Sequence, residues 1–198
     1  MKRILITGGT VFVSRFIAEY YIVMGYEVYV LNRNQHPQPA NANLIQADRH
    51  HLGSTLSKLH FDVVIDTAYT AQDINLGGCD QYLLISSSAV YPENAPQPFM
   101  EETPLGANQY WGTYGTNKIA AEQALQKRKP DAYILRPPYL YGPMNNIYRE
   151  AFVFDCALQG HSFYIPQNDT MKLQFFHIHD LCRFIDIILQ QKTLFGLY

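Results

Sequence analysis

Two side chains capable of acid–base chemistry, Tyr114 and Lys118, lie four residues apart in a segment that we expect to be helical. Residues at this spacing share one face of a helix, so both can reach one substrate atom. A tyrosine exchanges protons near neutral pH only when its phenolate is stabilised, and we expect the Lys118 ammonium to lower the pKa of Tyr114. A hydroxyl from the serine run 86–88, at the end of an expected strand, would hydrogen-bond the reacting oxygen. These residues predict acid–base catalysis on a hydroxyl or carbonyl group.

The second candidate site is the turn TGGTVFVS, residues 7–14, between an expected strand and an expected helix. A turn in this place directs the N–H groups of the helix terminus at a pyrophosphate. A motif of three glycines would place them at positions 8, 11 and 14, but this chain has Val11 and Ser14, and valine is unfavourable wherever φ must be positive. A plain strand-to-helix turn is the alternative. The predicted cofactor contacts of this turn are Gly8, Gly9, Thr10, Val11 and Phe12.

The adenosine end of the predicted site lies after the second strand, at Asn32 and Arg33. No acidic residue is present there to bond the ribose hydroxyls of NAD. Arg33 either pairs with a 2′-phosphate, which favours NADP, or is simply solvated. The predicted cofactor is therefore NAD or NADP.

The elements that must position these residues alternate between strands and helices over the first half of the chain. This order is typical of parallel strands joined by crossover helices. We expect an α/β fold with a Rossmann-like, doubly wound parallel sheet and a partial C-terminal substrate lobe. The expected strands are residues 4–7, 27–31, 44–47, 61–67, 82–86 and 133–136, and the expected helices are residues 15–24, 111–129, 149–159 and 179–191.

Composition limits the class of protein. The chain has 198 residues, a formal charge of −2, 47% apolar and 14% aromatic residues, which excludes a disordered chain. The near-neutral charge gives no broad basic footprint, so we do not expect a nucleic-acid partner. The three cysteines form no C-x-x-C pair, and no apolar run is long enough for a signal peptide or a membrane helix. We predict a cytoplasmic protein without disulfides and without membrane attachment.

Five motifs follow one another along the chain: residues 7–10 (TGGT), 85–91 (ISSSAVY), 114–118 (YGTNK), 135–143 (LRPPYLYGP) and 176–181 (FHIHDL). In this order they resemble the extended short-chain dehydrogenase/reductases, and the chain looks like the NAD-dependent epimerase/dehydratase branch. The best-known members of that branch act on nucleotide-activated sugars. The resemblance implies an NAD(P)-dependent epimerase or reductase of a nucleotide sugar or related hydroxyl substrate.

The resemblance also implies roles for individual residues. Ser87 would be the catalytic hydroxyl, Tyr114 the acid/base, and Lys118 the group that holds the nicotinamide ribose. Family dehydratases carry an Asp–Glu pair directly after the catalytic hydroxyl, whereas this chain has Ser88 and Ala89, which argues against a dehydratase. The further positions that the resemblance assigns to the cofactor are Asp48, Ala68 and Tyr69 for adenine and the ribose, and Pro137 and Pro138 beside the nicotinamide.

The resemblance further predicts the domain organisation. Residues 1–143 would form the dinucleotide-binding domain, and residues 144–198 part of a substrate-binding lobe with a returning strand and helix. Because family members usually continue beyond this point, we expect a C-terminally truncated chain. The helix with Tyr114 and Lys118 often takes part in a family dimer, so we expect a homodimer.

Other interpretations stay open on the sequence alone. A non-catalytic nucleotide-sensing or RNA-binding module with the same fold is one, and the valine at position 11 favours it. His177 and His179, two residues apart, would suit a metal site with Asp180, but no further ligand converges and the same residues match a family motif, so we predict no metal. The sugar, the choice between NAD and NADP, and the choice between epimerase and reductase stay open.

Overall fold

The computed structural model describes residues 1–76, 78–165 and 173–190. Its centre is a sheet of six parallel strands in the order β3-β2-β1-β4-β5-β6. This order, which steps outward from β1 on one side and from β4 on the other, is that of a doubly wound Rossmann-like fold, so the predicted fold class is confirmed. The strands are β1 (Arg3–Thr7), β2 (Glu27–Asn32), β3 (Asn43–Gln46), β4 (Phe61–Asp66), β5 (Cys79–Ile85) and β6 (Tyr133–Leu135).

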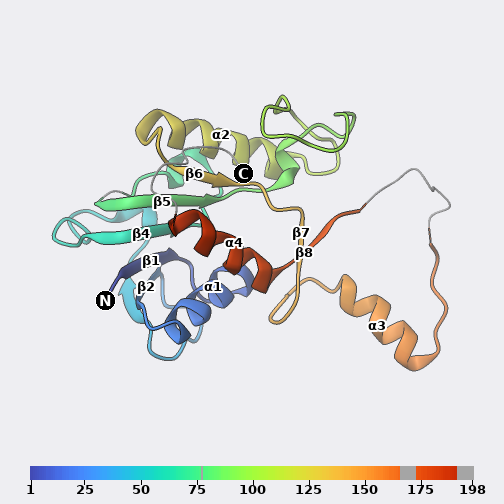
Figure 1. Ribbon diagram of the computed structural model, residues 1–198, viewed down its shortest axis with the longest axis horizontal. Helices are drawn as coiled ribbons and strands as arrows, with labels where there is room; N and C mark the ends of the chain where they lie inside the picture. Colours follow the sequence, from blue (N-terminus) through green and yellow to red (C-terminus); the bar gives the residue numbers. More distant parts are fainter. Residues whose placement is uncertain (77, 166–172, 191–198) are drawn as a thin grey trace.

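Helices cover both faces of the main sheet (Figure 1). Helices α1 (Phe12–Val23) and α4 (Ile178–Gln190) lie on one face, and α2 (Thr113–Arg128) lies on the other. Side chains alternate along a strand, so Ile4 of β1 packs into the core beneath α1 and α4, whereas Leu5 packs into the core beneath α2. A strand that is buried on both faces has a nearly continuous run of apolar residues, which is why these strands could be predicted from the sequence. Within the described residues, no helix combines the length and the apolar character that a membrane span requires.

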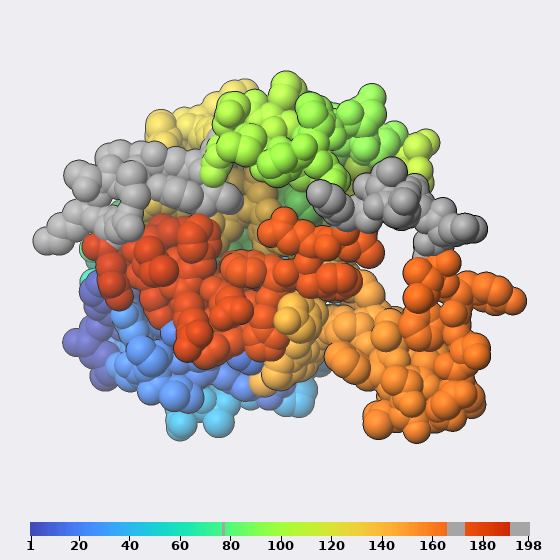
Figure 2. Space-filling model, turned by 45° about the vertical axis from the view of Figure 1, so that its right-hand side comes forward, coloured from blue at the N-terminus to red at the C-terminus, as the bar shows by residue number. Residues whose placement is uncertain are grey.

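A second, smaller sheet follows β6. Strand β7 (Tyr139–Tyr141) pairs in parallel with β8 (Phe175–His177), and α3 (Glu150–Gln159) lies between them in the chain. Figures 1 and 2 show α3 projecting from the main body. Large apolar side chains of this helix, including Phe154 and Leu158, are exposed.

Helix α4 packs against the main sheet. Its Leu181 and Ile185 belong to the core on the α1 face. The hydroxyls of Tyr20 and Tyr21 on α1 both donate to the Asp186 carboxylate on α4, at 2.5 and 2.9 Å. This contact attaches the returning helix of the predicted substrate lobe to the dinucleotide-binding fold.

Short 3-10 turns extend three of the strands at one edge of the sheet. η1 (Arg49–His51) comes after β3, η2 (Ala71–Asp73) after β4 and η3 (Ser88–Val90) after β5. Because the strands are parallel, their carboxyl ends lie at the same edge, where ligands of doubly wound sheets bind. The turns that follow the strands therefore carry the candidate site.

Candidate functional site

The turn after β1 contains two glycines that its backbone requires. Gly8 and Gly9 have φ values of 78° and 77°, a region that residues with a Cβ rarely adopt. A Cβ on Gly9 would also lie 2.5 Å from Cγ1 of Val30. The Gly8 N–H donates to the Leu31 carbonyl at 2.9 Å, so the turn lies directly against the end of β2.

Val11 does not need the positive φ that would make a valine unfavourable. Its backbone is extended, with φ −131°, and it immediately precedes α1. The non-glycine residue of this turn that has a positive φ, of 28°, is Phe12. Ser14, the other residue at an expected glycine position, donates from Oγ to the Val11 carbonyl at 3.1 Å and packs against Gly8. The objection to Val11 drawn from the sequence is therefore wrong, because any residue can adopt this backbone conformation.

A cavity of about 430 Å³, the Arg33 cavity, lies beside this turn. The Asn32 amide donates to the Gly8 carbonyl at 2.6 Å and so fastens β2 to the turn, while Arg33 is exposed. The Asp48 carboxylate accepts the His50 N–H at 2.9 Å, and this hydrogen bond holds the pKa of Asp48 below its ordinary value. The predicted cofactor contacts that line the Arg33 cavity are Gly8, Thr10, Asn32, Arg33, Asp48 and Tyr69.

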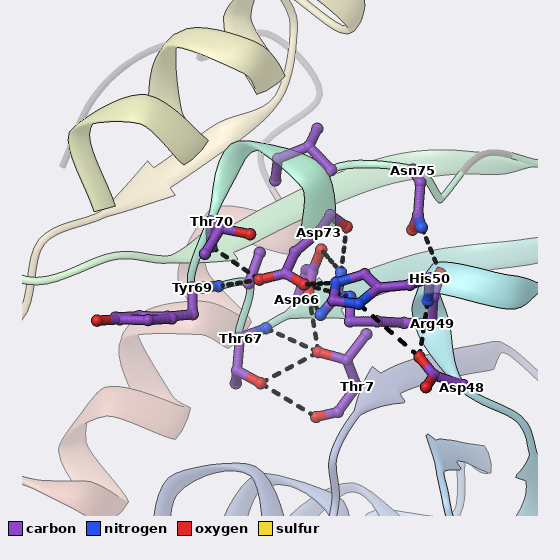
Figure 3. Close-up of polar contacts among 12 residues, drawn as sticks. Thr7, Asp48, Arg49, His50, Asp66, Thr67, Tyr69, Thr70, Asp73 and Asn75 are labelled. Carbon is purple, nitrogen blue, oxygen red and sulfur yellow. Dashed lines mark hydrogen bonds and ion pairs between the residues drawn. The ribbon is translucent and has the colours of Figure 1, made fainter. Parts of the chain in front are cut away.

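A buried polar cluster lies beside the Arg33 cavity (Figure 3). The fully buried carboxylate of Asp66, at the end of β4, accepts two hydrogen bonds of 3.0 Å from the Arg49 guanidinium. It also accepts the hydroxyl of Thr7 at 2.7 Å and the hydroxyl of Tyr82. A two-point bond between an arginine and a carboxylate fixes both side chains in position and orientation. The turn after β3 is thereby attached to the end of β4.

Asp73, in η2, is the second carboxylate of this cluster. Its Oδ2 accepts the backbone N–H groups of Tyr69 and Thr70, at 2.8 and 2.7 Å. Its Oδ1 lies 2.7 Å from Nε2 of His50 and 3.4 Å from Nε of Arg49. Burial raises the pKa of Asp73, but the hydrogen bonds outweigh burial and lower it to about 2. Asp73 is therefore ionised at neutral pH.

Arg49, Asp66 and Asp73 were not predicted from the sequence. For Asp73 a signal existed, since Thr70 and Asp73 have the spacing of a capping box, and the Thr70 N–H donates to the Asp73 carboxylate as in that motif. Asp66 ends the apolar run FDVVID, where a buried carboxylate needs a partner. Nothing in the sequence indicates that Arg49 is that partner.

A second cavity, of about 410 Å³ and called the Tyr114 cavity, adjoins the first at Thr67, which lines both. Its lining includes Ser87, Tyr114 and Lys118, the residues predicted to do the chemistry. Ser87 follows β5, whereas Tyr114 and Lys118 lie one turn apart on α2. Of the predicted cofactor contacts, Phe12, Pro137 and Pro138 line this cavity, and Gly9, Val11 and Ala68 line neither of the two.

The Lys118 ammonium is held by backbone carbonyls. Nζ donates to Ala68 at 2.7 Å and to Ile85 at 2.9 Å, and the residue is 5% exposed. These carbonyls lie just after β4 and at the end of β5, so Lys118 joins the carboxyl ends of two central strands. Burial lowers the pKa of Lys118 to about 8, although the charges of Asp66 and Glu122 oppose this shift.

The pKa of Tyr114 is shifted in the direction opposite to the prediction. Burial raises this pKa, the hydrogen bond with the Ser87 hydroxyl opposes the rise, and the phenol of Tyr69 adds to it. Lys118 was expected to lower the pKa, but its N–H groups are bonded to carbonyl oxygens. Tyr114 is therefore a neutral phenol at neutral pH.

A buried ion pair anchors α2 beneath these residues. Glu122 on α2 is 1% exposed and accepts from Nη2 of Arg136 at 2.7 Å and from its Nε at 3.2 Å. Ser86 donates its hydroxyl to the same carboxylate. Since Ser86 immediately precedes Ser87 and Arg136 follows β6, the pair holds together the helix and both strand ends that form the cavity wall.

His177 and His179 pack against aromatic rings. The His177 ring lies 5.0 Å from that of Tyr141, and the His179 ring lies 6.5 and 5.8 Å from those of Phe16 and Tyr20, measured between centroids. In residues 1–76, 78–165 and 173–190, no group of three or more His, Cys, Asp or Glu side chains could hold a metal ion. These two histidines contribute to packing around the start of α4.

The chain belongs to the NAD dependent epimerase/dehydratase family, which it matches over residues 71–195. The matched stretch runs from η2 onward and includes Ser87, Tyr114 and Lys118. Membership confirms the resemblance found in the sequence. The family is NAD-dependent.

Two curated relatives differ in the functions that their names state. Chloroplast stem-loop binding protein of 41 kDa b, from Arabidopsis thaliana, is 27% identical over 217 residues, covering 97% of this chain and 56% of that protein. UDP-glucose 4-epimerase from Erwinia amylovora is 35% identical over 63 residues, covering 32% of this chain and 18% of that protein. This chain thus spans about half the length of the Arabidopsis protein.

Two solved structures have the same fold. The Bordetella bronchiseptica enzyme WbmG, in complex with NAD, has a TM-score of 0.82 at 19% identity, covering 100% of this chain and 71% of that one. UDP-N-acetylglucosamine 4-epimerase from Bacillus cereus has a TM-score of 0.79 at 20% identity, and the match covers 100% of this chain and 77% of that one. At these identities the likeness shows the fold alone.

Proposed function

We propose that this protein is an NAD(P)-dependent epimerase or reductase that acts on a hydroxyl group of a nucleotide sugar or a related substrate. The observation that carries the proposal is the convergence of Ser87, Tyr114 and Lys118 in one cavity, which adjoins a second cavity at the glycine turn. Family membership and the similarity to a protein named UDP-glucose 4-epimerase support the substrate class.

The residues present fit a dinucleotide cofactor. At the glycine turn Gly8, whose φ is 78°, lines the Arg33 cavity without a side chain, so its backbone is open to the close approach that a pyrophosphate requires. When bound, the nicotinamide supplies the hydride acceptor and donor. Gly8 and Thr10 would hold the pyrophosphate, Arg33 and Asp48 the adenosine half, and Lys118 and Pro137 the nicotinamide half.

Tyr114 handles the proton at the substrate oxygen. As a neutral phenol it donates its proton when a carbonyl is reduced to a hydroxyl, and as a phenolate it accepts that proton in the reverse direction. The Ser87 hydroxyl donates a hydrogen bond to the phenolate or to the reacting oxygen, and stabilises whichever carries negative charge. Because its pKa is raised, Tyr114 carries its proton at neutral pH, which is the form that the reduction step requires.

Cofactor binding and turnover test this function separately. Trp111, the one tryptophan of the chain, lines the Tyr114 cavity, so quenching of its fluorescence reports nicotinamide binding there. Turnover is followed on a panel of nucleoside diphosphate sugars, by nicotinamide absorbance for reduction and by product analysis for epimerisation. Tyr114→Phe should lower turnover by at least about 10²-fold, with Tyr110→Phe, which changes an exposed neighbour, as the matched control. Unchanged turnover in Tyr114→Phe would refute the assignment.

A second candidate function is RNA binding by the same fold. It is favoured by the Arabidopsis relative, which is named a stem-loop binding protein and aligns with 97% of this chain. Titration with a labelled RNA stem-loop at several salt concentrations tests it, because contacts to phosphates weaken steeply with salt. Tight RNA binding that NAD does not displace, with no turnover of any nucleotide sugar, would favour RNA binding over the enzyme.

Oligomeric state, location and domain division complete the proposal. We propose a cytoplasmic homodimer with a contact through α2, whose Thr116, Gln123 and Lys127 are exposed. Sedimentation over a range of concentrations tests the dimer, and imaging of the tagged protein tests the location. The division into a dinucleotide-binding domain, residues 1–143, and a substrate lobe, residues 144–198, also stays a proposal.

A further inference from the structure

The turn between β4 and β5, residues 67–73, separates the two cavities. Thr67 lines both cavities, and Tyr69 lines the Arg33 cavity. The ring of Tyr69 stacks on the ring of Tyr114, with 5.7 Å between centroids and 28° between planes. Tyr69 therefore contacts, through its own ring, the phenol that faces the other cavity.

The backbone of this turn is held by one carboxylate. Figure 3 shows the Tyr69 ring extending away from the polar cluster, while its N–H faces Asp73. The Tyr69 and Thr70 N–H groups bond Oδ2 of Asp73 at 2.8 and 2.7 Å. Asp73 is 6% exposed and ionised, and hydrogen bonds from backbone to a charged carboxylate are stronger than those to neutral groups. The conformation of the turn at Tyr69 thus depends on Asp73.

Asp73 is in turn fixed from the wall of the Arg33 cavity. His50 lies 2.7 Å from its Oδ1 and Arg49 lies 3.4 Å away, and both residues line that cavity. Arg49 also makes its two-point bond to the fully buried Asp66. An unbroken series of contacts therefore runs from the wall of one cavity to the tyrosine of the other.

Tyr114 needs such support because of its place on α2. It is the second residue of that helix and 37% exposed, and the preceding Gly112 provides no side-chain cap. The O–H bond of a phenol lies in the plane of the ring, so the ring plane sets the direction in which the proton is given. A ring stacked on one face restricts that plane. The ring of Trp111, which also lies close to that of Tyr114, is tilted by 52°.

We propose that Tyr69 is a positioning residue for Tyr114, and that Asp73 holds Tyr69 in place. The inference rests on the proposed function, in which Tyr114 handles the proton. Tyr69 was expected from the family resemblance to contact the cofactor. Tyr114 covers the stacked face of the Tyr69 ring, so a ligand in the Arg33 cavity would contact the other atoms of Tyr69. Small displacements of a reacting group reduce catalysis strongly, which gives the stacking its functional value.

Nuclear magnetic resonance of the full chain, with carbon-13 in the tyrosine rings, tests the positioning without any substrate. The Tyr114 ring signals are assigned by their loss in Tyr114→Phe. Tyr69→Leu removes the stacked ring and defines the unstacked position of those signals, and Tyr69→Phe should keep them near their wild-type position. Asp73→Asn, which alters neither ring, should move them toward the Tyr69→Leu position. Unmoved signals in Asp73→Asn would overturn the role of Asp73.

Asp80→Asn is the matched control, since Asp80 also pairs with a histidine, His60, but both side chains are 64% exposed. It should leave the Tyr114 signals unmoved, and an equal shift in this variant would also overturn the proposal. If Asp73→Asn does not fold, the turnover of Tyr69→Leu, described next, decides whether Tyr69 positions Tyr114.

Turnover separates positioning from binding. Tyr69→Leu should lower kcat, measured at saturating cofactor as judged from Trp111 quenching, by about tenfold or more. Tyr69→Phe should restore most of the lost kcat, because a ring is present again. A kcat in Tyr69→Leu equal to wild type overturns the proposal. Signal shifts as expected in a protein without any turnover would instead count against the proposed function.

Discussion

Replacement of Glu122 by glutamine breaks the buried ion pair that anchors α2. Glu122 is 1% exposed and the Arg136 side chain is 5% exposed, so the change leaves a buried guanidinium without its counter-charge. Breaking a buried pair in this way costs about 3–5 kcal/mol. Arg136 keeps two other acceptors, the Tyr91 hydroxyl at 2.9 Å and the Glu101 carbonyl at 3.2 Å. We therefore expect Glu122→Gln to lower the free energy of unfolding by about 3 kcal/mol, the lower end of that range.

Thermal unfolding measures this cost. In a chain of this size each kcal/mol lowers the melting temperature by about 2–4 °C, so Glu122→Gln should melt roughly 6–12 °C below wild type. Removing both charges, in Glu122→Leu with Arg136→Met, should recover part of the loss. Asp80→Asn, at an exposed pair, is the control and should shift melting by less than about 4 °C. A cost below about 1 kcal/mol in Glu122→Gln, or a double variant less stable than the single one, would refute the reasoning.

Three further outcomes are expected. If activity needs the Lys118 ammonium, kcat/KM should fall as pH rises through about 8, because burial lowers that pKa, and a kcat/KM profile still flat about one unit higher would contradict this. Gly9→Ala should cost about 1–3 kcal/mol in urea unfolding, since its Cβ would meet Val30 at positive φ, and Val30→Ala in the same chain should restore part of it. Arg33→Ala should weaken NADP binding about tenfold and NAD binding far less, read from Trp111 quenching, and equal losses for both would remove Arg33 from the 2′-phosphate site.

The main sheet could be predicted from the sequence because its strands are buried on both faces. Runs such as FDVVID in β4 are apolar throughout, and the segments between them have helical patterns or turn residues. Parallel pairing then places every carboxyl end at one edge. That is why Ser87 and Tyr114, which lie on different elements, were expected in one place and are found in one cavity.

The parts that could not be predicted depend on backbone groups and on distant partners. The carbonyls of Ala68 and Ile85 that hold Lys118 leave no mark in the sequence, so the lysine was expected to act on Tyr114 instead. The pairing of Arg49 with Asp66 depends on how β3 and β4 are spaced in the folded sheet. The raised pKa of Tyr114 follows from partial burial of its phenol, which spacing along a helix does not determine.

The division of the edge into two cavities has an evolutionary consequence. The Arg33 cavity is formed largely by the turns after β2 and β3, and the Tyr114 cavity by segments after β5 and β6. Substitutions at exposed positions of one set of turns, such as Arg33, leave the other wall unaltered, so a lineage can change its cofactor and its substrate one at a time. Thr67, which belongs to both walls, and His50, which contacts Asp73, are positions where a change made for one preference would disturb the other.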